Sequence, residues 1–230
     1  MDQSLALNAL APYIALAKSA TSPRAAADLI TQATSAANTY VFAELLQHSN
    51  IQTLQENPEY RSYYTLLAIF SWGTWETYNQ TPDLPALSDA QLLKLRLLSL
   101  LTIASDRHAT TSSTPRSSNL SYASLCALLG LATPLDLEHL ITQAIYSNLL
   151  TATLNPASQT VHITAVSPLR DLAPGSVGVM TTELEAWSLR CQSVLATLDA
   201  EIAKVRGAAA RRAMREQKAE KQIKVVVDSA

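Results

Sequence analysis

The chain has 230 residues, enough for one large domain or two small ones with a sizeable core. With 48% hydrophobic and 16% charged residues, extensive disorder is excluded, and five glycines against abundant Leu and Ala favour an α-rich fold. The chain has no run of about 18 uncharged apolar residues and no basic signal-peptide segment at its start, so we expect a soluble intracellular protein. Cys126 and Cys191 lie in apolar helical patterns and are expected to be reduced core thiols.

The net charge of −2 conceals an asymmetry along the chain. Residues 204–230 carry eight basic and three acidic side chains, whereas the preceding 203 residues carry nine basic and sixteen acidic ones. A basic end on an acidic body can bind nucleic acid, a membrane surface or an acidic protein, but it is more often a solvated helix end. No aromatic residues alternate with these cations, which argues against single-stranded nucleic acid.

The first hundred residues predict successive helices separated by capping signals. These are a helix over 4–20 that Pro12 should break or kink, a helix from Pro23 capped by Ser22, two short helices within 40–55, one helix over 58–80 and one that follows the Ser88–Gln91 capping box. The helix over 58–80 is rich in aromatic residues. At helical spacing, such residues usually pack between helices rather than line a ligand pocket.

A polar, Ser/Thr-rich loop over 106–119 should separate this array from a small winged helix-turn-helix at 120–166. There we predict a helix over Ser121–Leu131 that Gly130 closes, and a second helix over 133–150 with Thr133 as N-cap and Pro134 at its first position. Two β-prone runs within 151–164 surround an Asn-Pro-Ala-Ser turn and predict a hairpin.

The second helix of this module favours protein binding over DNA binding. It carries Asp136, Glu138 and His139 but no Lys or Arg, whereas a helix in the major groove needs cations for the phosphates. Only Gln143 and Asn148 could contact base edges. The predicted winged helix is therefore a protein-binding module.

Apolar and polar side chains alternate along the second run of the hairpin, which we expect to be its outer strand. The side chains on one face should cover the core, while the backbone at the strand edge stays open to a partner strand. Val161 and Ile163 should face one side. The predicted partner-binding edge consists of Thr160, Val161, His162, Ile163 and Thr164.

After a linker at 167–178, a long helix over 179–230 ends in the basic segment, with its strongest helical pattern over 179–222. Apolar residues recur at alternating spacings of four and three over three heptads, which predicts a partner helix from this chain or another. This stripe also includes Ser188, and beyond Gly207 it fails. The residues predicted to contact the partner are Leu184, Trp187, Cys191, Leu195, Leu198, Ile202 and Val205.

Sequence signatures of catalysis are absent. The histidines are isolated, and no zinc-ligand spacing, nucleophile elbow, phosphate loop or dinucleotide fingerprint occurs. Paired acids such as Glu183 and Glu185 lie two residues apart on helices and point to different sides. We therefore expect a protein that is not an enzyme and has no cofactor, metal or small-molecule substrate.

A helical array followed by a protein-binding winged helix resembles the PCI-domain family. Segments 17–46, 63–78, 93–105 and 137–155 are similar, in order and spacing, to subunit seven of the COP-9 signalosome within that family. The resemblance extends through the last helix. The run Tyr40–Leu46 and the run Phe70–Tyr78 are its most specific parts.

The resemblance implies a mainly α fold, with a right-handed array of helical hairpins, a winged helix and a long C-terminal helix. The expected divisions are 1–105, 106–119, 120–166, 167–178 and 179–230. It also implies a non-catalytic scaffold that supports cullin deneddylation and so regulates cullin-RING ubiquitin ligases. The implied partners are other PCI-domain and metalloprotease-fold subunits, in cytoplasm and nucleus, without a membrane.

Two departures from the family pattern accompany this resemblance. The loop 106–119 is longer than the family norm, and relatives continue past the position of Ala230 into a basic tail, so we expect the sequence to be a shortened form. Two alternative interpretations remain open. One is a PCI subunit of the proteasome lid or of translation initiation factor three, and the other is a winged-helix protein that binds nucleic acid.

Overall fold

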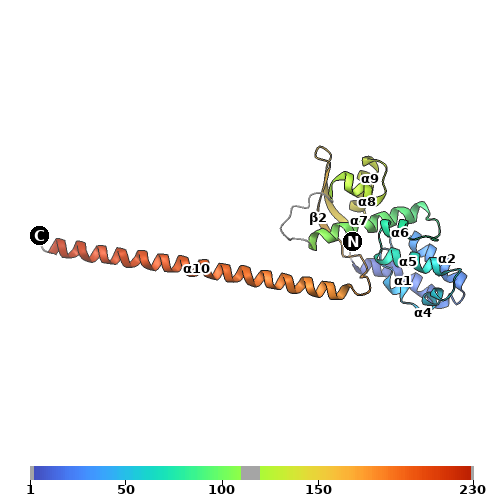
Figure 1. Cartoon of the computed structure of the whole chain (residues 1–230), viewed down its shortest axis with the longest axis horizontal. Coiled ribbons are helices and arrows are strands. Elements are labelled where there is room, and N and C mark those ends of the chain that lie inside the picture. The colour runs from blue at the N-terminus through green and yellow to red at the C-terminus, as the bar shows by residue number, and fades with distance from the viewer. Residues whose placement is uncertain (1–2, 110–119, 229–230) are drawn as a thin grey trace. The chain divides into compact units, whose positions relative to one another are not determined.

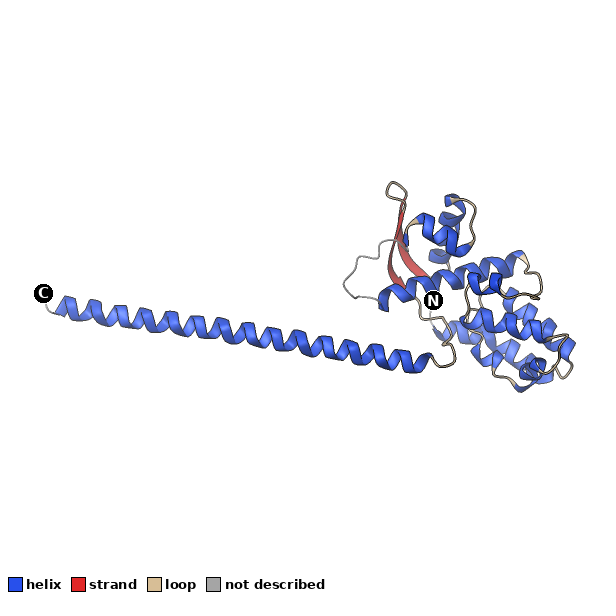
Figure 2. Ribbon diagram, viewed as in Figure 1, coloured by secondary structure: helices blue, strands red, loops and turns tan. Residues whose placement is uncertain are grey.

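The computed structural model describes residues 3–109 and 120–228, which divide into two compact units, 1–174 and 175–230 (Figures 1 and 2). The first unit contains most of the secondary structure. Its elements are α1 (Gln3–Ser19), α2 (Pro23–Ser35), α3 (Ala43–Leu46), α4 (Ser49–Gln52), the 3-10 turn η1 (Thr53–Gln55), α5 (Arg61–Trp72), α6 (Trp75–Gln80), α7 (Asp89–Ala109), α8 (Tyr122–Leu129), α9 (Pro134–Tyr146), β1 (Leu150–Asn155) and β2 (Thr160–Val166). The second unit contains α10 (Ser176–Asp228). The mainly helical class with one small sheet is as predicted.

The first helices follow their capping signals. Ser22 Oγ accepts a hydrogen bond from Ala25 N at 3.3 Å, and Pro23 opens α2, whose buried face includes Ile30. Of the two effects predicted for Pro12, the break does not occur, because α1 continues through this proline, and the kink stays a prediction. A proline removes one backbone hydrogen bond, and the rest of the helix continues despite that loss.

The predicted single helix over 58–80 is in fact two helices, α5 and α6. Residues 58–60 form a turn, and the chain breaks again at Gly73 and Thr74. Thr74 caps α6 through a reciprocal capping box with Thr77, and Ser99 Oγ of α7 accepts from Trp75 N at 2.8 Å. The break was missed because this box ends in Thr rather than the Glu or Gln that marks most such boxes.

Helix α7 begins at the predicted capping box. Ser88 N donates to Gln91 Oε1 at 3.0 Å, and Gln91 N donates to Ser88 Oγ at 3.3 Å. Gln91 is buried, and its Nε2 donates to Thr34 Oγ1 of α2 at 2.7 Å. The helix continues to Ala109 and so includes the first residues of the predicted loop 106–119. Residues 110–119 lie outside the described part of the chain.

The winged helix forms where it was predicted, with different boundaries. Ser121 caps α8, Gly130 ends it with a left-handed φ of 62°, and Thr133 and Asp136 form a capping box on α9. Helix α9 ends at Tyr146, four residues before the predicted end, because Asn148 adopts a φ of 53° and the chain turns into β1. The hairpin is antiparallel with Asn155 opposite Thr160.

One apolar cluster runs through the whole first unit. Buried residues of the helical array, such as Phe70 and Leu98, belong to the same cluster as Leu125 of α8, Ile141 of α9 and Val161 of β2. The array and the winged helix therefore share one core and hold each other in a fixed arrangement.

Candidate protein-interaction surfaces

Strand β2 has the alternation that the sequence predicted. Val161 is buried with 3% exposure and Ile163 is half-buried, whereas His162 and Thr164 are exposed. Thr160, at the start of the strand, is half-buried. One face of the strand thus covers the core and the other faces outward.

The assumption that β2 is the outer strand needs a correction at its first residues. Ser121 forms an antiparallel bridge with Thr160, and Tyr122 N donates to Gln159 O at 2.9 Å. The start of β2 is therefore flanked on both sides, by β1 and by the residues that precede α8. The sequence does not predict this bridge, because Ser121 falls inside the predicted helix over Ser121–Leu131.

This bridge also fixes which backbone groups of β2 point outward. The hydrogen bond from Tyr122 N to Gln159 O joins residues adjacent to the bridged pair of Ser121 and Thr160. The N–H and C=O groups of Thr160 itself therefore point away from Ser121 and toward β1. In an antiparallel ladder the direction of the N–H and C=O groups alternates from one residue to the next, so the N–H and C=O groups of His162 also face β1. The groups that point away from β1 belong to Val161 and Ile163, before the bulge that leaves Thr164 without an opposite residue.

The outer edge of β1 is the more open one. Among the described residues, no strand or bridge pairs with that edge. Since Thr153 and Asn155 lie opposite His162 and Thr160, their peptide groups face β2, and those of Ala152 and Leu154 point outward. N–H and C=O groups that point outward from an edge strand are a template for a strand from another protein.

The outward face of α9 carries apolar and acidic groups. Leu135 is 60% exposed and Tyr146 is 83% exposed, and the exposed His139 lies between them at helical spacing. Asp136 and Glu138 add negative charge, and the helix has no Lys or Arg. This surface is suited to a protein and repels the phosphates of DNA.

A joint formed by Arg96, Trp75 and the backbone of Leu129 and Gly130 fastens the helical array to the winged helix. Arg96 of α7 donates from Nε to Leu129 O at 3.1 Å and from Nη2 to Gly130 O at 2.8 Å. Its guanidinium lies over the Trp75 ring, 5.2 Å from the ring centre. The aromatic run around Trp75 thus serves packing, as predicted, and Trp75 also stacks on Tyr78 with ring centres 5.6 Å apart.

The segment after β2 is a strap rather than a free linker. Leu169 is buried, and Arg170 donates to Thr102 Oγ1 at 2.8 Å, to Phe70 O at 2.7 Å and to Gly73 O. Asp171 accepts from Phe42 N at 2.7 Å and from Ala43 N at 2.9 Å, which caps α3.

The electrostatics of this strap follow from its burial. Burial lowers the pKa of Arg170 to about 10, although neighbouring Asp171 opposes this shift. Burial likewise raises the pKa of Asp171 against the two backbone hydrogen bonds. The first part of the predicted linker 167–178 therefore ties α3, α5 and α7 together. Its polar composition concealed this role.

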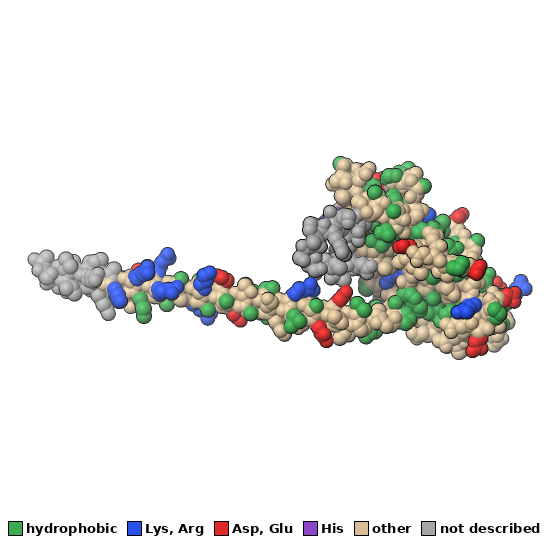
Figure 3. Space-filling model, in the orientation of Figure 1, with side chains coloured by type: hydrophobic (Ala, Val, Ile, Leu, Met, Phe, Trp, Pro, Cys, Tyr) green, Lys and Arg blue, Asp and Glu red, His purple; other side chains and the backbone are tan. Residues whose placement is uncertain are grey.

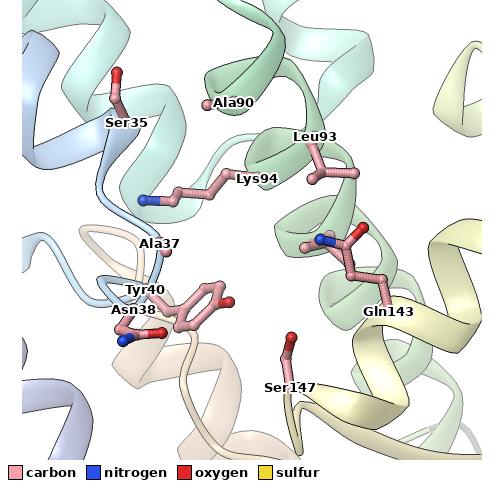
Figure 4. Close-up of a pocket in the computed structure, with 10 residues that line it drawn as sticks. Ser35, Ala37, Asn38, Tyr40, Ala90, Leu93, Lys94, Gln143 and Ser147 are labelled. Carbon is pink, nitrogen blue, oxygen red and sulfur yellow. The ribbon is translucent and has the colours of Figure 1, made fainter.

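A cavity of about 220 Å³ lies where the end of α2, the start of α7 and the end of α9 meet (Figure 4). Lys94 is buried beside it, and its Nζ donates to Thr39 Oγ1 at 3.1 Å and to Ala36 O. Burial lowers the pKa of Lys94 to about 7. Because this amino group already caps the end of α2, we assign the cavity to the packing of α2 on α7 rather than to a ligand.

Helix α10 begins at Ser176, three residues before the predicted start, and continues to Asp228. The apolar residues of the predicted stripe are exposed, with Ile202 at 47% and Val205 at 65%. Cys191 is exposed too, so the prediction of a core thiol is wrong for this residue, while Cys126 is half-buried. We name Leu184, Ser188, Cys191, Leu195, Leu198, Ile202 and Val205 the α10 seam. Trp187, beside the seam, is 59% exposed.

Among the residues that the structure describes, no group of three or more His, Cys, Asp or Glu side chains could hold a metal ion. In the same part of the chain, no single helix is long and apolar enough to cross a membrane. Only the bent pair α8 and α9 passes that test, and on length and composition alone.

Comparison with known proteins agrees with this architecture. The sequence profile of the PCI domain matches residues 72–165, and that of the CSN7 helical bundle subdomain matches residues 12–43. The COP9 signalosome complex subunit 7 of Dictyostelium discoideum is 31% identical over 189 residues, which cover 82% of this chain and 68% of that protein. The chain belongs to the COP9 signalosome subunit 7 family.

Two fungal members of the subunit 7 family are more similar still. COP9 signalosome complex subunit 7a of Neurospora crassa is 46% identical over 228 residues, which cover 94% of this chain and 55% of that protein. The subunit 7 of Emericella nidulans is 48% identical over 225 residues, which cover 94% of this chain and 66% of that protein. The chain thus spans between about half and two thirds of the length of these relatives.

Proposed function

We propose that this chain is a non-catalytic scaffold subunit of the COP9 signalosome, the complex that removes the ubiquitin-like modifier Nedd from cullins. In this role it supports the regulation of cullin-RING ubiquitin ligases in cytoplasm and nucleus. Membership of the subunit 7 family carries the proposal. Its partners are other PCI-domain subunits and metalloprotease-fold subunits, and the catalytic chemistry belongs to one of the latter.

Two surfaces support a scaffold role. The outer edge of β1 offers peptide groups of Ala152 and Leu154 to the strand of a neighbouring PCI subunit, and the α10 seam offers three heptads of apolar side chains to a helical bundle. The predicted edge residues Thr160 to Thr164 form the second strand of this hairpin. In the proposal they support β1, with Val161 covering the core while His162 and Thr164 face outward.

Affinity purification of the tagged chain tests which assembly it joins. We expect signalosome subunits to co-purify, and recovery of proteasome-lid or initiation-factor subunits instead would contradict the proposal. The purified chain should also lack isopeptidase activity on a neddylated cullin and should hold no stoichiometric zinc after dialysis. One equivalent of zinc by elemental analysis would argue against a non-catalytic subunit.

A pair of proline variants tests the β1 edge. Ala152→Pro removes an outward N–H from an edge strand and should weaken binding to the neighbouring subunit by about 1–3 kcal/mol, with little effect on folding. The matched change His162→Pro removes a donor that faces β1 and should destabilise the hairpin itself. Equal loss of stability in both variants would contradict the assigned orientation.

The nucleic-acid alternative predicts a different ranking. Replacing Arg211, Arg212, Arg215 and Lys218 by Gln should abolish salt-dependent retention on DNA or RNA if the basic segment binds nucleic acid. In our proposal these changes leave the β1 contact intact, because that contact is made by main-chain groups. A loss confined to nucleic-acid binding would favour the alternative.

A further inference from the structure

The α10 seam is an apolar face that no other element of its own unit, 175–230, covers. Its central residues Leu195 and Leu198 are 61% and 53% exposed. A helix with such a stripe over three heptads gains stability when a second helix covers it. The charged residues beside the seam indicate which kind of helix can cover it.

Charge changes sign along α10. Over 177–198 the helix carries Glu183 and Glu185 against Arg190. Over 199–218 it carries six basic residues against Asp199, Glu201 and Glu216, and the basic side chains gather along this half in Figure 3. A partner helix that fits α10 therefore places basic side chains beside the acidic half of α10, residues 177–198. A second α10 that runs in the opposite direction meets this requirement.

We propose that α10 pairs with α10 of a second copy of this chain in an antiparallel two-stranded coiled coil when other partner helices are absent. The seam residues alternate between the a and d positions of a heptad. In an antiparallel coiled coil, each a residue of one helix packs beside a d residue of its partner. This register places Leu195 beside the partner's Leu198, and Cys191 beside the partner's Ile202. Ser188 then lies beside the partner's Val205.

The flanking residues agree with this register. Glu185 lies opposite the partner's Arg206, and Glu183 lies near the partner's Arg211. Trp187, next to the seam, lies opposite the small side chain of the partner's Ala208. In a parallel pair the flanking contacts would have different partners: Glu185 would lie beside the partner's Met180, and the contact of Glu185 with Arg206 would not form.

This self-association goes beyond the proposed scaffold function, because it concerns the chain before its assembly. The dimer covers the same seam that a helical bundle would cover, so the two states exclude each other. Other subunits must therefore displace the second copy, and self-association protects the seam from unspecific contacts until they do.

Cysteine cross-linking of the full chain, in a Cys126→Ser background, tests the geometry. The residue Cys191 should not cross-link to its own copy, because the antiparallel register separates the two by eleven positions along the helix. The variant Ile202→Cys should form a disulfide with Cys191 of the second copy under mild oxidation, since these positions are adjacent. The control that combines Ile202→Cys with Cys191→Ser should stay uncross-linked.

Light scattering over a wide range of concentrations tests the dimer itself. We expect the mass to rise from 24.8 kDa toward twice that value, and Leu195→Asp to weaken the association roughly tenfold or more. Near-ultraviolet circular dichroism verifies that the first unit of this variant remains folded. A monomer at all concentrations would overturn the proposal. A disulfide between two Cys191 residues in place of the designed one would overturn the antiparallel arrangement.

Discussion

A Cβ atom on Gly130 would lie 2.2 Å from Nε1 of Trp75. The end of α8 and the start of α6 therefore meet at a distance that only a glycine permits. The same glycine has a left-handed φ of 62°, which most other residues adopt at a cost. Two independent constraints thus coincide at the joint between the array and the winged helix.

Replacing this glycine should loosen that joint. We expect Gly130→Ala to lower the free energy of unfolding by about 2–4 kcal/mol, from backbone strain and from displacement of the indole. Chemical denaturation followed by tryptophan fluorescence measures the change. Gly207→Ala is the matched control, because nothing lies within 4 Å of its added Cβ, and it should leave this transition unchanged.

The strap should tolerate no other cation at position 170. Arg170 donates to three acceptors on two segments, and the single ammonium of lysine cannot reach all of them. We expect Arg170→Lys to reduce the free energy of unfolding by about 2–4 kcal/mol. A thermal melt within experimental error of the parent protein would show that these hydrogen bonds contribute little.

Lys94 should make stability depend on pH. Its pKa of about 7 in the folded state lies below the usual 10.5, so the unfolded chain binds more protons between these values. Stability should therefore rise from pH 7 toward pH 10, by up to roughly 4 kcal/mol from this group. Denaturant midpoints at several pH values test this rise, and Lys94→Met should flatten it. An identical slope in both proteins would assign the effect to other groups.

The cap at Asp171, the residue that follows Arg170 in the strap, offers a complementary test. Asp171→Ala removes the acceptor for Phe42 N and Ala43 N and leaves two part-buried donors unpaired. We expect a loss of about 1–3 kcal/mol. Hydrogen exchange of these two amides reads the change locally, and unaltered protection of both would contradict the capping role.

Local signals in the sequence predicted most of the elements. The caps predicted at Ser22, Ser88 and Thr133 each lie directly before a helix, because a side-chain oxygen that accepts a backbone N–H works within three residues. The hairpin followed from alternation around a turn. The resemblance of the runs Tyr40–Leu46 and Phe70–Tyr78 identified the family before any geometry was known.

What the sequence did not predict depends on contacts between distant residues. Arg170 binds groups about 100 positions earlier, and nothing in its neighbourhood marks it. The bridge between Ser121 and Thr160 and the burial of Lys94 against α2 have the same origin. The partners of the hairpin edge and of the α10 seam lie outside this chain, so they remain predictions.

The single core that joins the array to the winged helix has a consequence for how the chain can be divided. A winged helix with a core of its own could be transplanted or lost as a unit, but here Leu125, Ile141 and Val161 complete the packing of Leu98 and Phe70. Cleavage within 110–119 should therefore yield two fragments that are each poorly soluble and that regain native structure only when mixed.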